Sequence, residues 1–177
     1  MRQRTVFSLM IAAPLWALPA AADPVGFHPD GCDFEISFPA APALSQSKTD
    51  TDRGDQVTTT RAVLNDGANY LRAECTHVPA MHFLDEDILN NNMRDMGTAY
   101  KLTGFTTGVD HNEISGPIGW LRGQGKLGGK DVTIEVRRFT GKASIFDVWM
   151  AAAPDAFPAP AGVSFRKTVK AEGKLVP

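Results

Sequence analysis

The sequence lacks the short motifs by which many hydrolases and thiol oxidoreductases are recognised. Neither the Gly-x-Ser-x-Gly turn of serine hydrolases nor the His-Glu-x-x-His helix of zinc proteases occurs among its 177 residues. The redox motif Cys-x-x-Cys is missing as well. Since the members of a catalytic triad can be far apart in sequence, these absences argue against an enzyme and leave an enzyme with a dispersed site as the alternative.

A hydrophobic run long enough to cross a membrane is also missing. The apolar stretch at residues 6–18 is shorter than the roughly 20 residues that a spanning helix needs, and Pro14 interrupts it. It follows two arginines and precedes a run of small residues, which is typical of a cleaved signal peptide. We therefore predict a signal peptide over residues 1–22, cleaved after Ala22. The mature chain, residues 23–177, should have no membrane anchor and be periplasmic or secreted.

Cysteine is scarce, since Cys32 and Cys75 are the only two. An even number in an exported chain predicts a disulfide, because compartments outside the cytoplasm are oxidising. The alternation of apolar and polar residues puts Cys32 on the same side as the apolar residues of the strand Phe34–Phe38. Cys75 likewise shares a side with Leu71 and Ala73. Both sulfur atoms should therefore point into the core and bond to each other.

The chain has no excess of positive charge, with 18 basic and 20 acidic residues. No basic stretch alternates with aromatic residues as in proteins that bind single-stranded nucleic acids, so we predict no nucleic-acid partner. The charge is unevenly distributed, because residues 23–115 are mainly acidic and residues 116–177 mainly basic. Two interpretations are open: the halves complement each other within one fold, or the basic half receives an anionic partner.

The first half of the mature chain has mainly strand character. Alternation predicts a strand at Phe34–Phe38 that stops at Pro39. Two runs at residues 57–64 and 70–78 flank an Asn-Asp-Gly turn and predict a hairpin. The polar residues 45–55 before this hairpin predict an exposed loop or a wide turn.

The periodicity then changes to that of a helix. Apolar residues recur at spacings of three and four and predict one buried helix face. These residues are Leu84, Ile88, Leu89, Met93, Met96 and Tyr100. Asp85, Glu86 and Asp87 lie at the predicted start, where acidic side chains cap free amides. Gly104 is the predicted stop.

Strand character returns after residue 104. We predict four strands joined as consecutive hairpins, at residues 106–114, 118–127, 132–139 and 144–151. Residues 161–171, which follow several prolines, predict a closing helix with Val163, Phe165 and Val169 partly buried. The whole order predicts an α+β fold, an antiparallel β-sheet of about six to seven strands with an amphipathic helix and a C-terminal helix packed on it.

One run and the order of elements resemble a known family. The run Phe34-Glu35-Ile36-Ser37-Phe38-Pro39-Ala40-Ala41-Pro42 is similar to the opening strand of PsbP-like proteins. The succession of hairpin, amphipathic helix, Gly-Pro-bounded hairpin, long strand pair and final helix is similar too, and it covers nearly the whole mature chain. PsbP-like proteins include an extrinsic photosystem II subunit, a Ran-binding import factor and many exported bacterial proteins. The resemblance implies a single PsbP-like α+β domain over residues 23–177 and a non-catalytic protein that binds or assists other proteins.

The sequence contains two weak signals for bound groups. The glycines 123, 125 and 128 match Gly-x-Gly-x-x-Gly, but a strand pattern follows them where a dinucleotide site needs a helix, so we predict no cofactor. His77 and His82 are the weak candidates for metal ligands. Pro79 interrupts the chain between these histidines, so the preferred interpretation is that no metal is bound. A metal or small-ligand carrier using His77 and His82 is an alternative.

The late strands carry a candidate interaction surface. Alternation puts Trp120, Arg122 and Lys126 on one side of a strand, and Arg137 lies on the next strand. Arg and Trp are enriched at the centres of interfaces, but the solvent side of a one-sided sheet also needs polar residues.

These observations favour an exported, non-catalytic binding or assembly accessory with an unidentified protein partner in the periplasm. The alternative is a hydrolase-like enzyme, for which a deep pocket would have to gather groups such as Asp110 and His111.

Overall fold

The computed structural model describes residues 23–50, 55–78, 84–112 and 116–172. The predicted signal peptide and His82 lie outside these residues. The elements follow one another along the chain as β1 (Val25–Phe27), β2 (Phe34–Phe38), β3 (Ala43–Asp50), β4 (Gln56–Asn65), β5 (Asn69–His77), α1 (Glu86–Ala99), β6 (Thr103–Asn112), β7 (Gly116–Leu127), β8 (Lys130–Thr140), β9 (Ser144–Ala152), α2 (Pro160–Lys167) and β10 (Lys170–Ala171).

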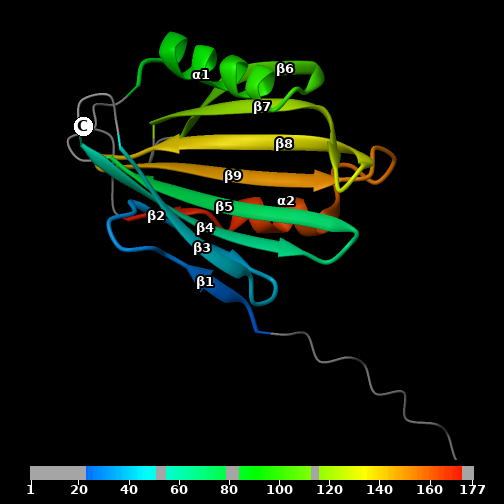
Figure 1. The fold of residues 1–177 in the computed structure, drawn as a ribbon, viewed down its shortest axis with the longest axis horizontal. Helices are drawn as coiled ribbons and strands as arrows, with labels where there is room; N and C mark the ends of the chain where they lie inside the picture. Colours follow the sequence, from blue (N-terminus) through cyan, green and yellow to red (C-terminus); the bar gives the residue numbers. More distant parts are fainter. Residues whose placement is uncertain (1–22, 51–54, 79–83, 113–115, 173–177) are drawn as a thin grey trace, which may run out of the picture.

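Antiparallel strands form two sheets. The larger sheet has seven strands in the order β3-β4-β5-β9-β8-β7-β6, and the smaller has three in the order β1-β2-β10. Figure 1 shows α1 along β6 and β7 at one end of the large sheet, and β1, β2 and α2 toward the other end. The broad α+β class predicted from the sequence is confirmed, while the second sheet was not foreseen. Among the described residues, no helix has the length and apolar character to span a bilayer.

The two faces of the large sheet bury different clusters. The face that carries Leu121, Val136 and Trp149 packs against α1 and is called the α1 face. The face that carries Phe146 and Met150 packs against α2 and the small sheet, and is called the α2 face. The cluster on the α2 face has more buried residues than the cluster on the α1 face, so most of the apolar core lies on the α2 face.

Helix α1 begins where the acidic residues predicted it. Asp85 is the N-cap, and its Oδ1 accepts a 2.8 Å hydrogen bond from the backbone N–H of Ile88. The helix lies so close to β7 that a Cβ at Gly119 would be 2.9 Å from Cγ of both Leu89 and Met93. This close approach explains a glycine in the middle of a buried strand.

The predicted buried face of α1 was partly wrong. Ile88 is 46% exposed and Tyr100 is 49% exposed, whereas Leu89 and Met93 are fully buried. The helix contacts the sheet along a narrow stripe at one end, so the outer members of the apolar pattern stay in contact with water.

Three further predictions from the sequence were wrong in detail. Residues 45–50 belong to β3 and pair with β4, because an edge strand can be polar on both sides. The final helix ends at Lys167, and β10 then pairs with β2. The strand β1 was missed. The strand predicted at Phe34–Phe38, the hairpin predicted at residues 57–64 and 70–78, and the four strands predicted after residue 104 are confirmed. Strand β6 starts earlier than predicted, at Thr103.

The predicted disulfide between Cys32 and Cys75 is confirmed. Each cysteine is 3% exposed and belongs to the core on the α2 face. The bond joins the segment before β2 to β5, so it connects the small sheet to the middle of the large one.

A row of charged residues crosses the α1 face beside the helix. Arg61, Glu74, Asp147 and Arg138 are neighbours on β4, β5, β9 and β8. The guanidinium of Arg138 donates to both oxygens of Asp147, at 2.8 and 2.7 Å. Burial acts to lower the pKa of Arg138, but the charge and hydrogen bonds of Asp147 outweigh it and the pKa is raised. The guanidinium of Arg138 therefore stays charged although it is largely buried.

The turn between β4 and β5 gives a prediction about acid stability. Asp66 Oδ1 accepts hydrogen bonds from the N–H groups of Asn69 (2.6 Å) and Ala68 (2.9 Å). The Asn69 N–H contributes most to lowering the pKa of Asp66 below its ordinary 3.8. A lowered folded-state pKa means that ionised Asp66 stabilises the fold above pH 3.8, and that this contribution disappears as the pH falls through the folded-state pKa.

We therefore expect Asp66→Asn to lower the free energy of unfolding at pH 7 by less than about 1 kcal/mol, because the turn is exposed. Urea denaturation at a series of pH values should show this deficit shrinking in acid. The control Asp155→Asn makes the same substitution in the exposed loop after β9 and should leave the free energy of unfolding at pH 7 unchanged. A deficit for Asp66→Asn that stays constant down to pH values below 3.8 would contradict this role.

Candidate functional site

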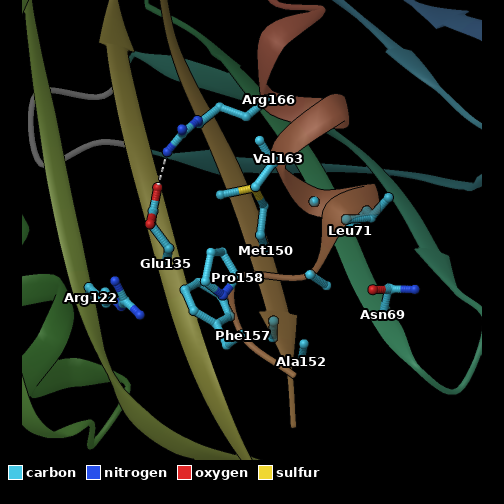
Figure 2. A pocket seen from close by; sticks show the side chains of 13 residues that line it. Asn69, Leu71, Arg122, Glu135, Met150, Ala152, Phe157, Pro158, Val163 and Arg166 are labelled. Atoms are coloured by element: carbon cyan, nitrogen blue, oxygen red, sulfur yellow. Dashed lines mark hydrogen bonds and ion pairs between the residues drawn. The ribbon is translucent and has the colours of Figure 1, made fainter. Parts of the chain in front are cut away.

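A pocket lies on the α2 face between helix α2, the loop that leads into it, and strands β5 and β7–β9. Its volume is about 230 Å³. Figure 2 shows the side chains that line it. The lining residues are Asn69, Leu71, Arg122, Glu135, Met150, Ala151, Ala152, Phe157, Pro158, Ala159, Gly162, Val163 and Arg166.

The floor of the pocket is apolar and comes from three elements. Leu71 on β5 is 2% exposed, and Met150, opposite it on β9, is 4% exposed. Val163 of α2 lies above Met150 in Figure 2. Leu71 and Met150 belong to the main core, so this part of the floor is held by packing. A ligand resting there would meet a preformed apolar surface.

One wall of the pocket, formed by Glu135 and Arg166, belongs to a chain of ion pairs that links β6 and β8 to α2. Oε1 of Glu135 accepts hydrogen bonds from Arg166 at 2.6 Å and from Arg137 at 3.1 Å. Arg137 also donates to Asp110 on β6, at 2.7 Å. Glu135 is only 12% exposed at its side chain, so it is a shielded acceptor held by two guanidinium groups. The chain fixes the distance between α2 and the strands.

The opposite rim is formed by Arg122 and Phe157. Arg122 lies on β7 directly opposite Glu135 in the sheet register. Its guanidinium carbon nevertheless stands 4.6 Å from the centroid of the Phe157 ring, a geometry that permits cation–π attraction. Arg122 is exposed and makes no ion pair with any carboxylate among the described residues. Its hydrogen-bond donors are therefore available to a ligand.

The predicted surface residues Trp120, Arg122, Lys126 and Arg137 do share one face. Trp120 is paired with Arg137 in the register, and the alternation along β7 puts Arg122 and Lys126 on the same side. Their surroundings differ, however. Lys126 forms a 2.7 Å ion pair with Asp131 at the end of the hairpin. Arg137 is held by two carboxylates, so Arg122 is the member of this set that lines the pocket.

Trp120 lies across the neighbouring edge strand. A Cβ at Gly108 would be 2.6 Å from Cζ2 of Trp120, so the indole ring rests directly on the glycine backbone. The side chain is half-buried there. It extends the apolar part of the α2 face toward β6.

The candidate metal ligand His77 has a structural contact. Its Nδ1 donates a 3.1 Å hydrogen bond to the carbonyl oxygen of Gly31 in the segment that ends at the disulfide. It borders a second hollow of about 290 Å³ together with His28 and Asp30. The described residues contain no group of three or more metal-ligating side chains. His82 lies outside the described residues, so its position relative to His77 stays a prediction.

Two residues named for a dispersed catalytic site are not brought together. Asp110 and His111 are consecutive in β6 and point to opposite faces of the sheet. Asp110 pairs with Arg137 on the α2 face, whereas Nε2 of His111 lies 3.2 Å from Oε1 of Glu86 at the start of α1. Both members of the His111–Glu86 pair are largely exposed.

The sequence also contains two Ser-x-x-Lys patterns, which occur in some serine enzymes. Ser45 and Lys48 lie on β3, and Ser164 and Lys167 lie on α2. All four side chains are exposed. Neither pair is thus shielded from water, as a serine and its activating base are in a catalytic pocket.

The glycine-rich run is part of a hairpin, as predicted. Gly123 and Gly125 lie within β7, Gly128 is in the turn, and β8 follows. A Cβ at Gly123 would be 2.6 Å from Cβ of Phe105, so the glycine allows β6 to approach. The close approach of β6 therefore explains the glycine at position 123.

The sequence alone did not identify Arg166, Glu135 and Phe157 as neighbours in one pocket. The excess of basic residues in the second half signals Arg166 only in a general way. Phe157 comes from a proline-rich loop without periodicity.

The chain matches no protein-family model, and no curated protein matches it significantly.

Proposed function

We propose that this chain is an exported, non-catalytic binding protein that assists other proteins, and that its fold is of the PsbP-like type. The observation that carries the proposal is the rim of the pocket on the α2 face. There Arg122, which has no carboxylate partner among the described residues, stands beside an apolar floor. A guanidinium is a strong recognition group and a poor proton carrier at neutral pH.

The lining of the pocket supports binding over catalysis. Its thirteen described residues include no Ser, Thr, Cys, His, Lys or Tyr. The carboxylate among them, Glu135, is engaged by two arginines and is poorly placed to accept a proton from a substrate. The order of elements is compatible with the PsbP-like resemblance, which supports the proposal through the fold alone.

Two observations support export. The first 22 residues have the composition of a signal peptide, and Cys32 is bonded to Cys75, a state that persists outside the reducing cytoplasm. Protein purified from the periplasmic fraction should therefore begin at Asp23.

A crosslinking experiment in the native host tests the proposed function. A photo-crosslinking amino acid in place of Gln124, exposed on the α2 face near Arg122, should give a discrete adduct with a partner protein. The matched control replaces Arg94, an exposed residue of α1 on the other side of the sheet, and should give none. Mass spectrometry of the adduct identifies the partner.

Charge reversal makes the experiment specific. Arg122→Glu should abolish the adduct formed from position 124, because the recognition group is replaced by its opposite. If position 124 forms no adduct with any protein, or the adduct is unaffected by Arg122→Glu, the proposed role of this face is wrong.

A further inference from the structure

The charges around the pocket leave one guanidinium uncompensated. Asp110, Arg137, Glu135 and Arg166 form a continuous chain of two carboxylates and two guanidiniums whose formal charges cancel. Arg122 lines the same pocket and has no described carboxylate partner. The site therefore carries one net positive charge, located at its rim.

The position of Arg122 suits a carboxylate. Contact with the face of Phe157 orients the planar guanidinium, so less conformational freedom is lost when a ligand binds. The edges of the plane remain free to donate two parallel hydrogen bonds, the geometry that matches a carboxylate group.

The floor limits what the carboxylate can be attached to. Leu71, Met150 and Val163 offer hydrophobic contact beneath the rim. The volume of about 230 Å³ is below the roughly 300 Å³ at which pockets for drug-sized ligands begin. With about 30 Å³ for a group the size of a water molecule, it holds about eight methylene-sized groups.

We infer that the pocket binds a carboxylate attached to a small apolar group, with the carboxylate on Arg122 and the apolar group on Leu71, Met150 and Val163. A free medium-chain fatty acid and the C-terminus of a polypeptide ending in an apolar residue share this chemistry. The inference goes beyond the proposed function, because a small carboxylate binds without a partner protein and would do so even if no protein adduct formed.

Isothermal titration calorimetry with the mature, disulfide-bonded protein tests the inference. Octanoate is the probe for the free acid, and the tripeptide Ala-Leu-Val with a free carboxyl group is the probe for a polypeptide end. At least one should bind with Kd of about 1 mM or tighter. The matching neutral compounds, 1-octanol and the amidated tripeptide, should bind at least tenfold more weakly, because they lack the charge that Arg122 recognises.

Two variants locate the site. Arg122→Gln should weaken the binding of the carboxylate at least tenfold. Lys126→Gln removes the same charge from the same face outside the pocket and should leave Kd unchanged. Both residues are exposed, so both variants should keep the thermal midpoint of the parent protein.

The outcomes are separable. Binding of octanoate alone identifies a carrier of small acids, and binding of the free tripeptide alone identifies a polypeptide end as the natural ligand. The inference is overturned if neither carboxylate binds, if the neutral compounds bind equally well, or if Lys126→Gln weakens binding as much as Arg122→Gln.

Discussion

Replacing Cys32 and Cys75 together by alanine is expected to lower the free energy of unfolding by about 4 kcal/mol. The bond closes a loop with a sequence separation of 43 residues, and the chain-entropy model assigns about that value to a loop of this length. Both cysteines are 3% exposed, so the lost sulfur atoms also reduce packing in the core. Urea denaturation of the mature protein, monitored by tryptophan fluorescence, measures the change.

Reduction of the parent protein provides the control for this variant. Parent protein kept in excess dithiothreitol lacks the bond but keeps both sulfur atoms, so its midpoint should fall by a similar amount without the loss of packing. A double alanine variant that loses less than about 1 kcal/mol would contradict the assignment of a major stabilising role to this bond.

Phe146→Ala is expected to have an effect of similar size, about 3–5 kcal/mol. The Phe146 side chain is fully buried on β9. Its ring centroid lies 5.7 Å from that of Phe34, 6.4 Å from that of Phe27 and 6.5 Å from that of Phe139. Truncation would open a cavity between the small sheet and the large one, because these four rings fill the space between them.

A second phenylalanine serves as the matched control. Phe157→Ala removes a ring of the same size from the half-exposed rim of the pocket and should cost less than about 1 kcal/mol. The two variants are compared by urea denaturation under identical conditions. Equal losses would show that the aromatic cluster is not the centre of the core.

The regular elements were predictable where their periodicity was local and long. Strand β2 has clear alternation, the hairpin of β4 and β5 has two runs around an Asn-Asp-Gly turn, and α1 has both an apolar stripe and an acidic cap. The strands that were missed lack such signals. β1 and β10 are only three and two residues long, and β3 is polar on both sides because it is an edge. The small sheet depends on residues far apart in sequence, which periodicity cannot pair.

The site was predictable only in part for a related reason. Alternation along β7 was enough to put Arg122 and Lys126 on one face. Whether Arg122 or Lys126 has a carboxylate partner among the described residues depends on side chains from other parts of the chain. Asp131 engages Lys126 across the hairpin end, whereas Phe157 reaches Arg122 from a loop about thirty-five residues further along the chain. Local sequence carries no information about such a choice.

The arrangement of the small sheet has a consequence for the order of assembly. Strand β2 lies between β1 and β10, so its second edge is satisfied only by Lys170 and Ala171. A chain that emerges amino end first would present β2 with one side open until residues more than 130 positions later arrive. Such distant pairings slow folding. The newly made protein would also expose the phenylalanines of β2 until β8, β9 and α2, whose phenylalanines pack on them, are in place, and would need protection from aggregation during that interval.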